Sequence, residues 1–296
     1  MDAASFQTLD KFSGIDQVSG ATRMPISYIE RMPVHPLRTA VNVDIDNTFR
    51  ITSRPGYADV LTGTDIHSLW ADAICLFVDG DTLYALMTDY SILTVRTVTR
   101  NARVSFVQLN DRTYYTNGHE IGFVKDYVNA DLSDPAKEFK LPLPAGQLIE
   151  VYKTRLYVAK DDVIYASDPL CDFYDVRTGY MQLAGKATML RAVDNGMYVS
   201  DDKTWFLKGD GPEDFTREEV YPSRAIPFTD VRMAGQYLDE QGAYAIWTAE
   251  NGICLGDSNG KVVNLTEGRY VLTGRGRGAG YVREIDNVRH YVNSLY

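Results

Sequence analysis

Short apolar segments separated by tight polar turns recur along most of the chain. Residues 74–78 (ICLFV) are followed by the turn Asp79-Gly80-Asp81 and then by a second segment, 82–86 (TLYAL). An Asp-Gly pair between two apolar runs is typical of a β-hairpin, because glycine adopts positive φ without a steric penalty. Hardly any window places apolar residues at helical spacing for three turns. The sequence therefore predicts an all-β protein.

The hairpin pattern occurs six times in the sequence. The other copies begin near residues 104, 148, 189, 244 and 281. A tyrosine lies on the second segment of five of the six hairpins, at positions 84, 114, 157, 198 and 291. The first of these tyrosines are spaced by roughly 30–45 residues, which is close to the length of a four-stranded propeller blade.

The first segment of each hairpin is often apolar at consecutive positions, which indicates burial on both faces. A two-layer sandwich with one face in water would alternate apolar and polar residues instead. Small sheets stacked around an axis bury both faces of their strands and leave only short, protected edges. We therefore expect a β-propeller of about six blades. Five blades is the alternative, because residues 210–245 are difficult to divide.

The two ends of the chain differ from the repeats between them. The last hairpin supplies only two strands, and residues 40–45 and 49–52 supply two more. Together they would form one composite blade, in which the terminal strands close the ring. Residues 1–34 show no periodicity, so we expect an N-terminal arm at 1–34 and a propeller domain at 35–296.

The composition limits the classes of partner. The chain has 296 residues, with 30 Lys and Arg against 40 Asp and Glu, and a net charge of −10. Such an acidic chain is unlike proteins that hold nucleic acid by its phosphates. No apolar stretch approaches the roughly 20 residues of a membrane helix, so we expect no membrane contact. Three widely spaced cysteines and four histidines indicate neither a disulfide framework nor a metal site.

Three short segments match catalytic or metal-binding motifs only in part. Residues 256–260 (GDSNG) resemble the nucleophile segment of chymotrypsin-like proteases, but Asn259 replaces the expected glycine. Residues 200–205 (SDDKTW) resemble a truncated Asp-box of sialidases, where the box is a structural turn. His119-Glu120 lacks the second histidine of a zinc-binding helix. We interpret these segments as turns and strands, and expect no catalytic residue, no cofactor and no metal.

Arginines gather near the end of the sequence, in and around the segment GRGRG. Arg269, Arg275 and Arg277 are the candidates for contact with a neighbouring subunit or with DNA. Arginine between glycines can bind single-stranded nucleic acid. It can equally pair with acidic groups of another subunit or remain in a solvated loop, and the sequence leaves these three alternatives open.

Residues 33–84 resemble a known family. The matching features are the run PVHPLRTAVNVDID at 33–46, Arg50, the tetrapeptide Arg54-Pro55-Gly56-Tyr57, the strand His67-Ser68-Leu69-Trp70 and Thr82-Leu83-Tyr84. Together they resemble the start of virion structural proteins of tailed bacteriophages. The segment is similar in style to tail-nozzle and packaged-DNA-stabilisation proteins of short-tailed phages.

The tetrapeptide within that segment also has a plain structural interpretation. Pro55-Gly56 fits the centre of a type II turn, in which proline sets φ at the first central position and glycine takes positive φ at the second. Tyr57 would then pack against the next blade. We expect Arg54, Pro55, Gly56 and Tyr57 to form a structural turn.

The resemblance implies a propeller subunit that assembles as a ring near the tail channel, as a nozzle, hub or connector, without enzymatic activity. Its partners would be further copies of the chain and other tail or head-tail connector proteins, and DNA would pass without sequence-specific contacts. The protein would be made in the host cytoplasm and reside in the virion tail. Two alternatives remain open: a propeller-type tail component that binds or hydrolyses glycans, and a cellular propeller scaffold.

Overall fold

The fold is given by a computed structural model of the chain. It describes residues 11–19, 27–29, 32–46, 48–54, 56, 58–234, 242–270, 272, 276–285 and 288–296. Every regular element in these ranges is a β-strand, which confirms the all-β prediction. In the same ranges no helix is long and apolar enough to cross a membrane.

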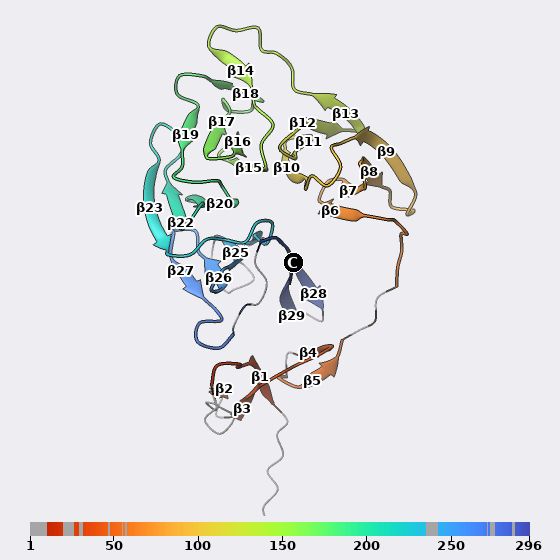
Figure 1. The fold of residues 1–296 in the computed structure, drawn as a ribbon, viewed down its shortest axis with the longest axis vertical. Coiled ribbons are helices and arrows are strands. Elements are labelled where there is room, and N and C mark those ends of the chain that lie inside the picture. Colours follow the sequence, from red (N-terminus) through yellow and green to blue (C-terminus); the bar gives the residue numbers. More distant parts are fainter. Residues whose placement is uncertain are drawn as a thin grey trace, which may run out of the picture.

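Five four-stranded antiparallel sheets, called blades 1 to 5, make up most of the described residues (Figure 1). Blade 1 contains β6 (Ile66–Ala71), β7 (Cys75–Asp79), β8 (Thr82–Leu86) and β9 (Ile92–Thr97). Blade 2 contains β10 (Ser105–Leu109), β11 (Arg112–Thr116), β12 (Ile121–Lys125) and β13 (Val128–Asp131). Blade 3 contains β15 (Leu148–Tyr152), β16 (Arg155–Lys160), β17 (Val163–Ala166) and β19 (Tyr180–Gln182).

The remaining strands form blades 4 and 5, the C-terminal hairpin and a small two-stranded ribbon. Blade 4 contains β20 (Met189–Val193), β21 (Gly196–Ser200), β22 (Thr204–Lys208) and β23 (Thr216–Tyr221). Blade 5 contains β24 (Val231–Ala234), β25 (Ala243–Ala249), β26 (Gly252–Gly256) and β27 (Val262–Asn264). The C-terminal hairpin consists of β28 (Gly278–Ile285) and β29 (Val288–Leu295). A small ribbon of β14 (Lys140–Pro142) and β18 (Phe173–Asp175) lies beside blade 3.

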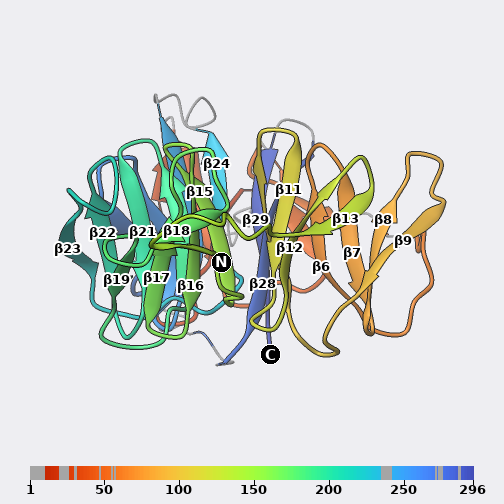
Figure 2. The ribbon, with the colours of Figure 1, turned by 90° about the horizontal axis from the view of Figure 1, so that it is seen from above.

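The blades follow one another around a common axis, with the first strand of each blade nearest to it (Figure 1). The first strands β10, β15 and β20 contact one another in sequence order. Seen from the side, the blade strands run roughly alongside one another through the thickness of the disc (Figure 2). This arrangement is a β-propeller.

Four apolar clusters fill the spaces between neighbouring blades. They join blades 1 and 2, blades 2 and 3, blades 3 and 4, and blades 4 and 5. Burial on both faces follows from this stacking: all seven residues of β25 are buried, and so are all five of β21. The predicted two-sided burial of the hairpin strands is therefore confirmed.

Three of the five tyrosines of the repeat lie in these clusters. Tyr114, Tyr157 and Tyr198 are 4 %, 0 % and 0 % exposed, and each lies on the second strand of its blade. Tyr84 instead lies on the third strand of blade 1, because β6 precedes the hairpin that the sequence pattern identifies. In the same way β24 precedes the hairpin near residue 244. Both first strands are partly exposed, so they lack the continuous apolar signal of the others.

Six positions around the axis are occupied, five by full blades and the sixth by the C-terminal hairpin, in agreement with the expected count of about six (Figure 1). The hairpin β4 (Val43–Ile45) and β5 (Ile51–Ser53) lies radially outside it, where the composite blade was expected. Among the described residues, the two hairpins are linked by an ion pair of 2.6 Å between Arg283 and Asp44, and no strand pairing joins them.

The N-terminal region forms a small sheet of its own. Strand β3 (Met32–Leu37) pairs in parallel with β1 (Phe12–Ile15) and antiparallel with β2 (Ser27–Ile29). The boundary predicted between residues 34 and 35 therefore falls inside β3. We refer to β1–β5 as the N-terminal module, which lies outside the ring of blades (Figure 1).

Tight two-residue turns connect several of the blade strands. Gly80 has a φ of +64° between β7 and β8, as the Asp-Gly signal predicts. Lys153 and Thr154 adopt φ values of 47° and 65° between β15 and β16. Non-glycine residues adopt this region less readily, so the pairing of the flanking strands must hold this turn.

Candidate functional site

A pocket of about 630 Å³ opens at one end of the propeller axis, and we call it the axial pocket. It is lined by loops that lead into the first strands of several blades, at residues 101–103, 147–148, 185–188, 224–228 and 276–277. Two turns between second and third strands, at 117–119 and 201–202, complete its wall. Convergence of the blades on one axis brings these distant segments together.

Side-chain acceptors hold two of the lining turns in shape. Asn117 Oδ1 accepts hydrogen bonds from the main-chain N–H groups of His119 and Glu120, at 2.9 and 2.8 Å. Asp201 Oδ1 accepts one from Trp205 Nε1 at 2.8 Å. Burial acts to raise the pKa of Asp201, but hydrogen bonds from Asp202 and Trp205 outweigh it and lower that pKa to about 2.

Four cationic side chains line the axial pocket: Arg103, Lys186, Arg224 and Arg277. The guanidinium of Arg103 stacks 4.9 Å from the centroid of the Phe228 ring. Its Nη1 donates a hydrogen bond to the hydroxyl of Tyr296. The pocket therefore combines fixed positive charge with an aromatic surface.

A second cavity of about 530 Å³, the channel cavity, continues from the axial pocket along the inner strands. The two share Arg103, Leu148 and Phe228 in their walls. The channel cavity lies where β6 faces the C-terminal hairpin, and its apolar lining includes Leu69 and Tyr281, which are 71 % and 49 % exposed. The space between blade 1 and this hairpin is thus less tightly filled than the other blade interfaces.

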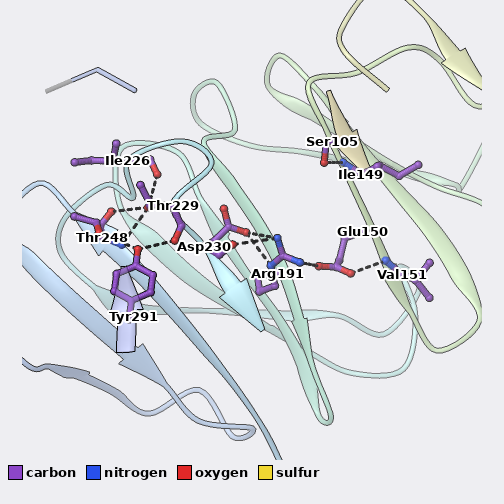
Figure 3. Close-up of polar contacts among 10 residues, drawn as sticks. All are labelled: Ser105, Ile149, Glu150, Val151, Arg191, Ile226, Thr229, Asp230, Thr248 and Tyr291. Carbon is purple, nitrogen blue, oxygen red and sulfur yellow. Dashed lines mark hydrogen bonds and ion pairs between the residues drawn. The ribbon is translucent and has the colours of Figure 1, made fainter. Parts of the chain in front are cut away.

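Arg191 on β20 bridges two buried carboxylates at the channel wall (Figure 3). Its Nη2 lies 2.7 Å from Asp230 Oδ2, and its Nη1 lies 2.9 Å from Glu150 Oε2. The contact with Glu150 is an ion pair without hydrogen-bond geometry. Burial raises the pKa of Glu150, although the positive charge of Arg191 acts to lower it. For Arg191, burial acts to lower the pKa, but the negative charges of Asp230 and Glu150 outweigh burial and raise it. Because Glu150 lies on β15 and Asp230 just before β24, the cluster pins three blades together.

Tyr291 of β29 anchors the C-terminal hairpin to blade 5 (Figure 3). Its hydroxyl donates to the main-chain oxygen of Thr229 at 2.6 Å and lies 3.0 Å from Thr248 Oγ1. Burial raises the pKa of Tyr291 to about 12, so the phenol remains a neutral donor at physiological pH. This attachment is polar, unlike the apolar clusters between the full blades.

The structure separates the predicted arginines. Arg277 lines the axial pocket. Arg269 lies against the N-terminal module, where its main-chain oxygen accepts a hydrogen bond from Gln17 N at 2.7 Å. Arg275 lies outside the described residues. The three arginines were predicted as one group, and the two described ones have different surroundings.

The predicted turn at 54–57 is described only in part. Arg54 pairs with Asp44 at 3.1 Å, and Asp44 in turn pairs with Arg283. Burial acts to raise the pKa of Asp44, but hydrogen bonds from Arg283 and Arg54 outweigh it and lower that pKa. Gly56 has open space around it, and Pro55 and Tyr57 lie outside the described residues.

The partial motifs occupy turns and strands. Ser258 donates a hydrogen bond of 2.6 Å to the main-chain oxygen of Ala243, and its segment turns between β26 and β27. Within the segment 200–205, residues 201–203 form the turn between β21 and β22, as the Asp-box comparison predicts. Within the described part of the chain, no three His, Cys, Asp or Glu residues are placed to hold a metal ion. Cys75 and Cys171 are only half-buried, whereas Cys254 is buried.

Sequence reasoning did not identify Arg103, Lys186 or Arg224, nor the cluster of Glu150, Arg191 and Asp230. Each of these residues lies alone in its own sequence context. What these residues share is their place in the repeat, since each precedes or occupies the first strand of a blade. This shared place could identify them only if the boundaries of the blades were already known.

No family model matches the chain, and no curated protein matches it. Several solved structures are similar in fold. The extracellular domain of a one-component system from B. thetaiotaomicron has a TM-score of 0.50 at 10% identity, over 76% of this chain and 30% of that one. A streptogramin B lyase has a TM-score of 0.49 at 11% identity, over 79% and 76% of the two chains. The WD40 β-propeller domain of Doa1 has a TM-score of 0.42 at 12% identity, over 67% of each chain.

At such low identity these likenesses concern the fold alone. One fold can host many unrelated functions, so the function has to be argued from the surfaces of this chain.

Proposed function

We propose that the chain is a structural component of a bacteriophage tail that forms a ring by subunit–subunit contacts near the tail channel, as a nozzle, hub or connector, without catalysis. The first support is the resemblance of residues 33–84 to virion structural proteins of tailed phages. The net charge of −10 also suits a channel component, because an acidic wall does not retain DNA through its phosphates.

The outer edge of blade 1 is the observation that carries this proposal. Strand β9 is the last strand of its sheet, so no strand of the described ranges pairs with its outer side. Tyr90, Ile92 and Leu93 at this edge are 62 %, 49 % and 44 % exposed. An apolar edge strand is prone to pair with another chain. A second copy of the protein, meeting this edge with a different face, would repeat the contact until a ring closes.

The N-terminal module adds a second surface for assembly. It lies outside the ring of blades (Figure 1), and it is fixed to the hairpin β28–β29 through the pair Asp44–Arg283. Fixed attachment lets the module present its surface to a neighbouring tail protein in a constant orientation.

The test compares the oligomeric state of the purified chain with that of two variants. The double variant I92K/L93K places charge on the apolar edge, and V128K does the same at the equally peripheral strand β13, where Val128 is 67 % exposed. Native mass spectrometry and electron microscopy should show closed rings for the unmodified chain and V128K, and monomers for I92K/L93K. A chain that stays monomeric at all concentrations and binds no other virion protein contradicts the proposal.

A glycan-binding or glycan-hydrolysing tail component is the second candidate, and the axial pocket favours it. Small-molecule sites are concave and combine apolar surface with a few placed polar groups. Phe228 and the charged loops around it provide both. A glycan array and a hydrolysis assay on host polysaccharide would both be blank if this candidate is wrong.

A further inference from the structure

Positive charge is concentrated in the axial pocket of an otherwise acidic protein. Arg103, Lys186, Arg224 and Arg277 come from four different loops, whereas the whole chain carries a net charge of −10. A concave site lined by one sign of charge focuses the electrostatic field on a ligand of opposite charge.

Two carboxylates share the pocket wall with the four cations. Asp201 is completely buried, lies 3.9 Å from Arg217, and receives hydrogen bonds from Asp202, Trp205 and the main chain. Asp202 is the exposed carboxylate of the wall. His119 is the remaining titratable group there.

Two of the four cations are already paired outside the pocket. Arg224 lies 2.7 Å from Glu250, and Lys186 lies 3.8 Å from Asp161. Among the described residues, Arg103 and Arg277 have no carboxylate partner. These two arginines are the ones available to a bound anion.

Tyr296 fixes the guanidinium of Arg103 and the main chain of Arg277. Its hydroxyl accepts a hydrogen bond from Arg103 Nη1. Its main-chain N–H donates to Arg277 O at 3.0 Å, and Arg277 N donates to the main-chain oxygen of Tyr296 at 3.2 Å. Arg103 is further fixed by stacking on Phe228. A cation that is positioned before the ligand arrives loses less conformational entropy on binding.

We propose that the axial pocket binds a small organic anion, in which a carboxylate or phosphate group meets Arg103 and Arg277 and a sugar-sized body lies against Phe228. Arginine suits both groups because its planar donors match their paired oxygens. The volume of about 630 Å³ lies within the range of small-molecule sites and is too small for a nucleic-acid duplex. This inference stands independently of the tail role, since it needs no oligomer.

Calorimetric titration of the full chain tests the proposal with four probes: glucose 6-phosphate, glucuronate, inorganic phosphate and uncharged glucose. We expect glucose 6-phosphate or glucuronate to bind more tightly than glucose, and the better of the two identifies the preferred anionic group. Raising the salt concentration should weaken this binding. Inorganic phosphate should bind more weakly than the sugar phosphate because it lacks the body that contacts Phe228.

Variants of exposed residues assign the site. R277Q should weaken binding of the charged sugar about tenfold, as expected for loss of one charged hydrogen bond. K186Q should weaken it less, since Lys186 is partly paired. R232Q is the matched control: Arg232 is 49 % exposed, pairs with Asp194 and lies outside the pocket wall. Absence of binding by both charged sugars, equal binding of glucose, or equal effects of R277Q and R232Q would overturn the proposal.

Discussion

Arg191 lies between two carboxylates that have little access to water, so the variant R191M leaves both of them without their cation. The side chains of Glu150 and Asp230 are each 5 % exposed, and that of Arg191 is 25 % exposed. Removing one partner of a buried ion pair costs about 3–5 kcal/mol, because the remaining charge is uncompensated. Since Arg191 keeps some contact with solvent, we expect R191M to lower the free energy of unfolding by about 3 kcal/mol at pH 7.

The pH dependence of the same cluster has a defined sign. Burial raises the pKa of Glu150 above its ordinary value of 4.5. A carboxyl group with a raised pKa binds its proton more tightly in the folded protein. Its contribution to stability is therefore complete below the unfolded pKa and declines as the pH rises through the folded pKa. R191M should lose less stability at pH 5 than at pH 7, because a lower pH favours the neutral form of Glu150.

The variant E150Q separates charge from shape. Glutamine resembles the protonated side chain, and the pair of Arg191 with Asp230 remains. We expect the free energy of unfolding of E150Q to lie within about 1 kcal/mol of that of the unmodified protein at pH 7. E150Q should also lack the decline in stability with rising pH that Glu150 causes.

Urea unfolding followed by circular dichroism, at pH 5 and pH 7, measures all these differences. R232M is the control, because Arg232 and Asp194 form an exposed pair whose loss should cost less than about 1 kcal/mol. The reasoning is refuted if R191M costs no more than R232M at pH 7, or if its loss is the same at both pH values.

Three further pairs of variants test the packing and the terminal contacts. D44N removes the partner shared by Arg54 and Arg283, so hydrogen exchange in β4 should accelerate, whereas D59N at an exposed position between β5 and β6 should leave it unchanged. Because the pKa of Asp44 is lowered, the protection factors of the β4 amides, which correct for the slower intrinsic exchange in acid, should fall in the unmodified protein as the pH drops through the pKa of Asp44, below its ordinary value of 3.8. W247A removes a fully buried ring between blades 4 and 5 and should cost about 3–5 kcal/mol in urea unfolding, and W247F should cost less because Trp247 Nε1 has no hydrogen-bond partner among the described residues. G256A would place a Cβ 2.5 Å from the Tyr198 ring and should cost about 1–3 kcal/mol, whereas G185A, with its nearest neighbour at 3.8 Å, should melt like the unmodified chain.

The blade hairpins could be predicted because both of their signals are local. The Asp79-Gly80 turn and the consecutive apolar residues on either side of it lie within a dozen residues. Burial on both faces of β21 and β25 follows from the same apolar runs. The strands β6 and β24 escaped this pattern because they are partly exposed and therefore lack a continuous apolar run.

The axial pocket could not be predicted in the same way. Arg103 and Arg277 are 174 positions apart, and only closure of the ring places both beside Tyr296. The cluster of Glu150, Arg191 and Asp230 likewise depends on the order of three blades around the axis. Of the predicted arginines, Arg277 was selected for its glycine-rich context, and its neighbours in the pocket come from other repeats.

Electron cryo-microscopy of the purified full chain tests the proposed assembly most directly. We expect several copies arranged around one symmetry axis, each with five four-stranded blades and a C-terminal hairpin, and with strand β9 buried where two copies meet. Single particles that contain one copy each, with β9 facing solvent, would contradict it.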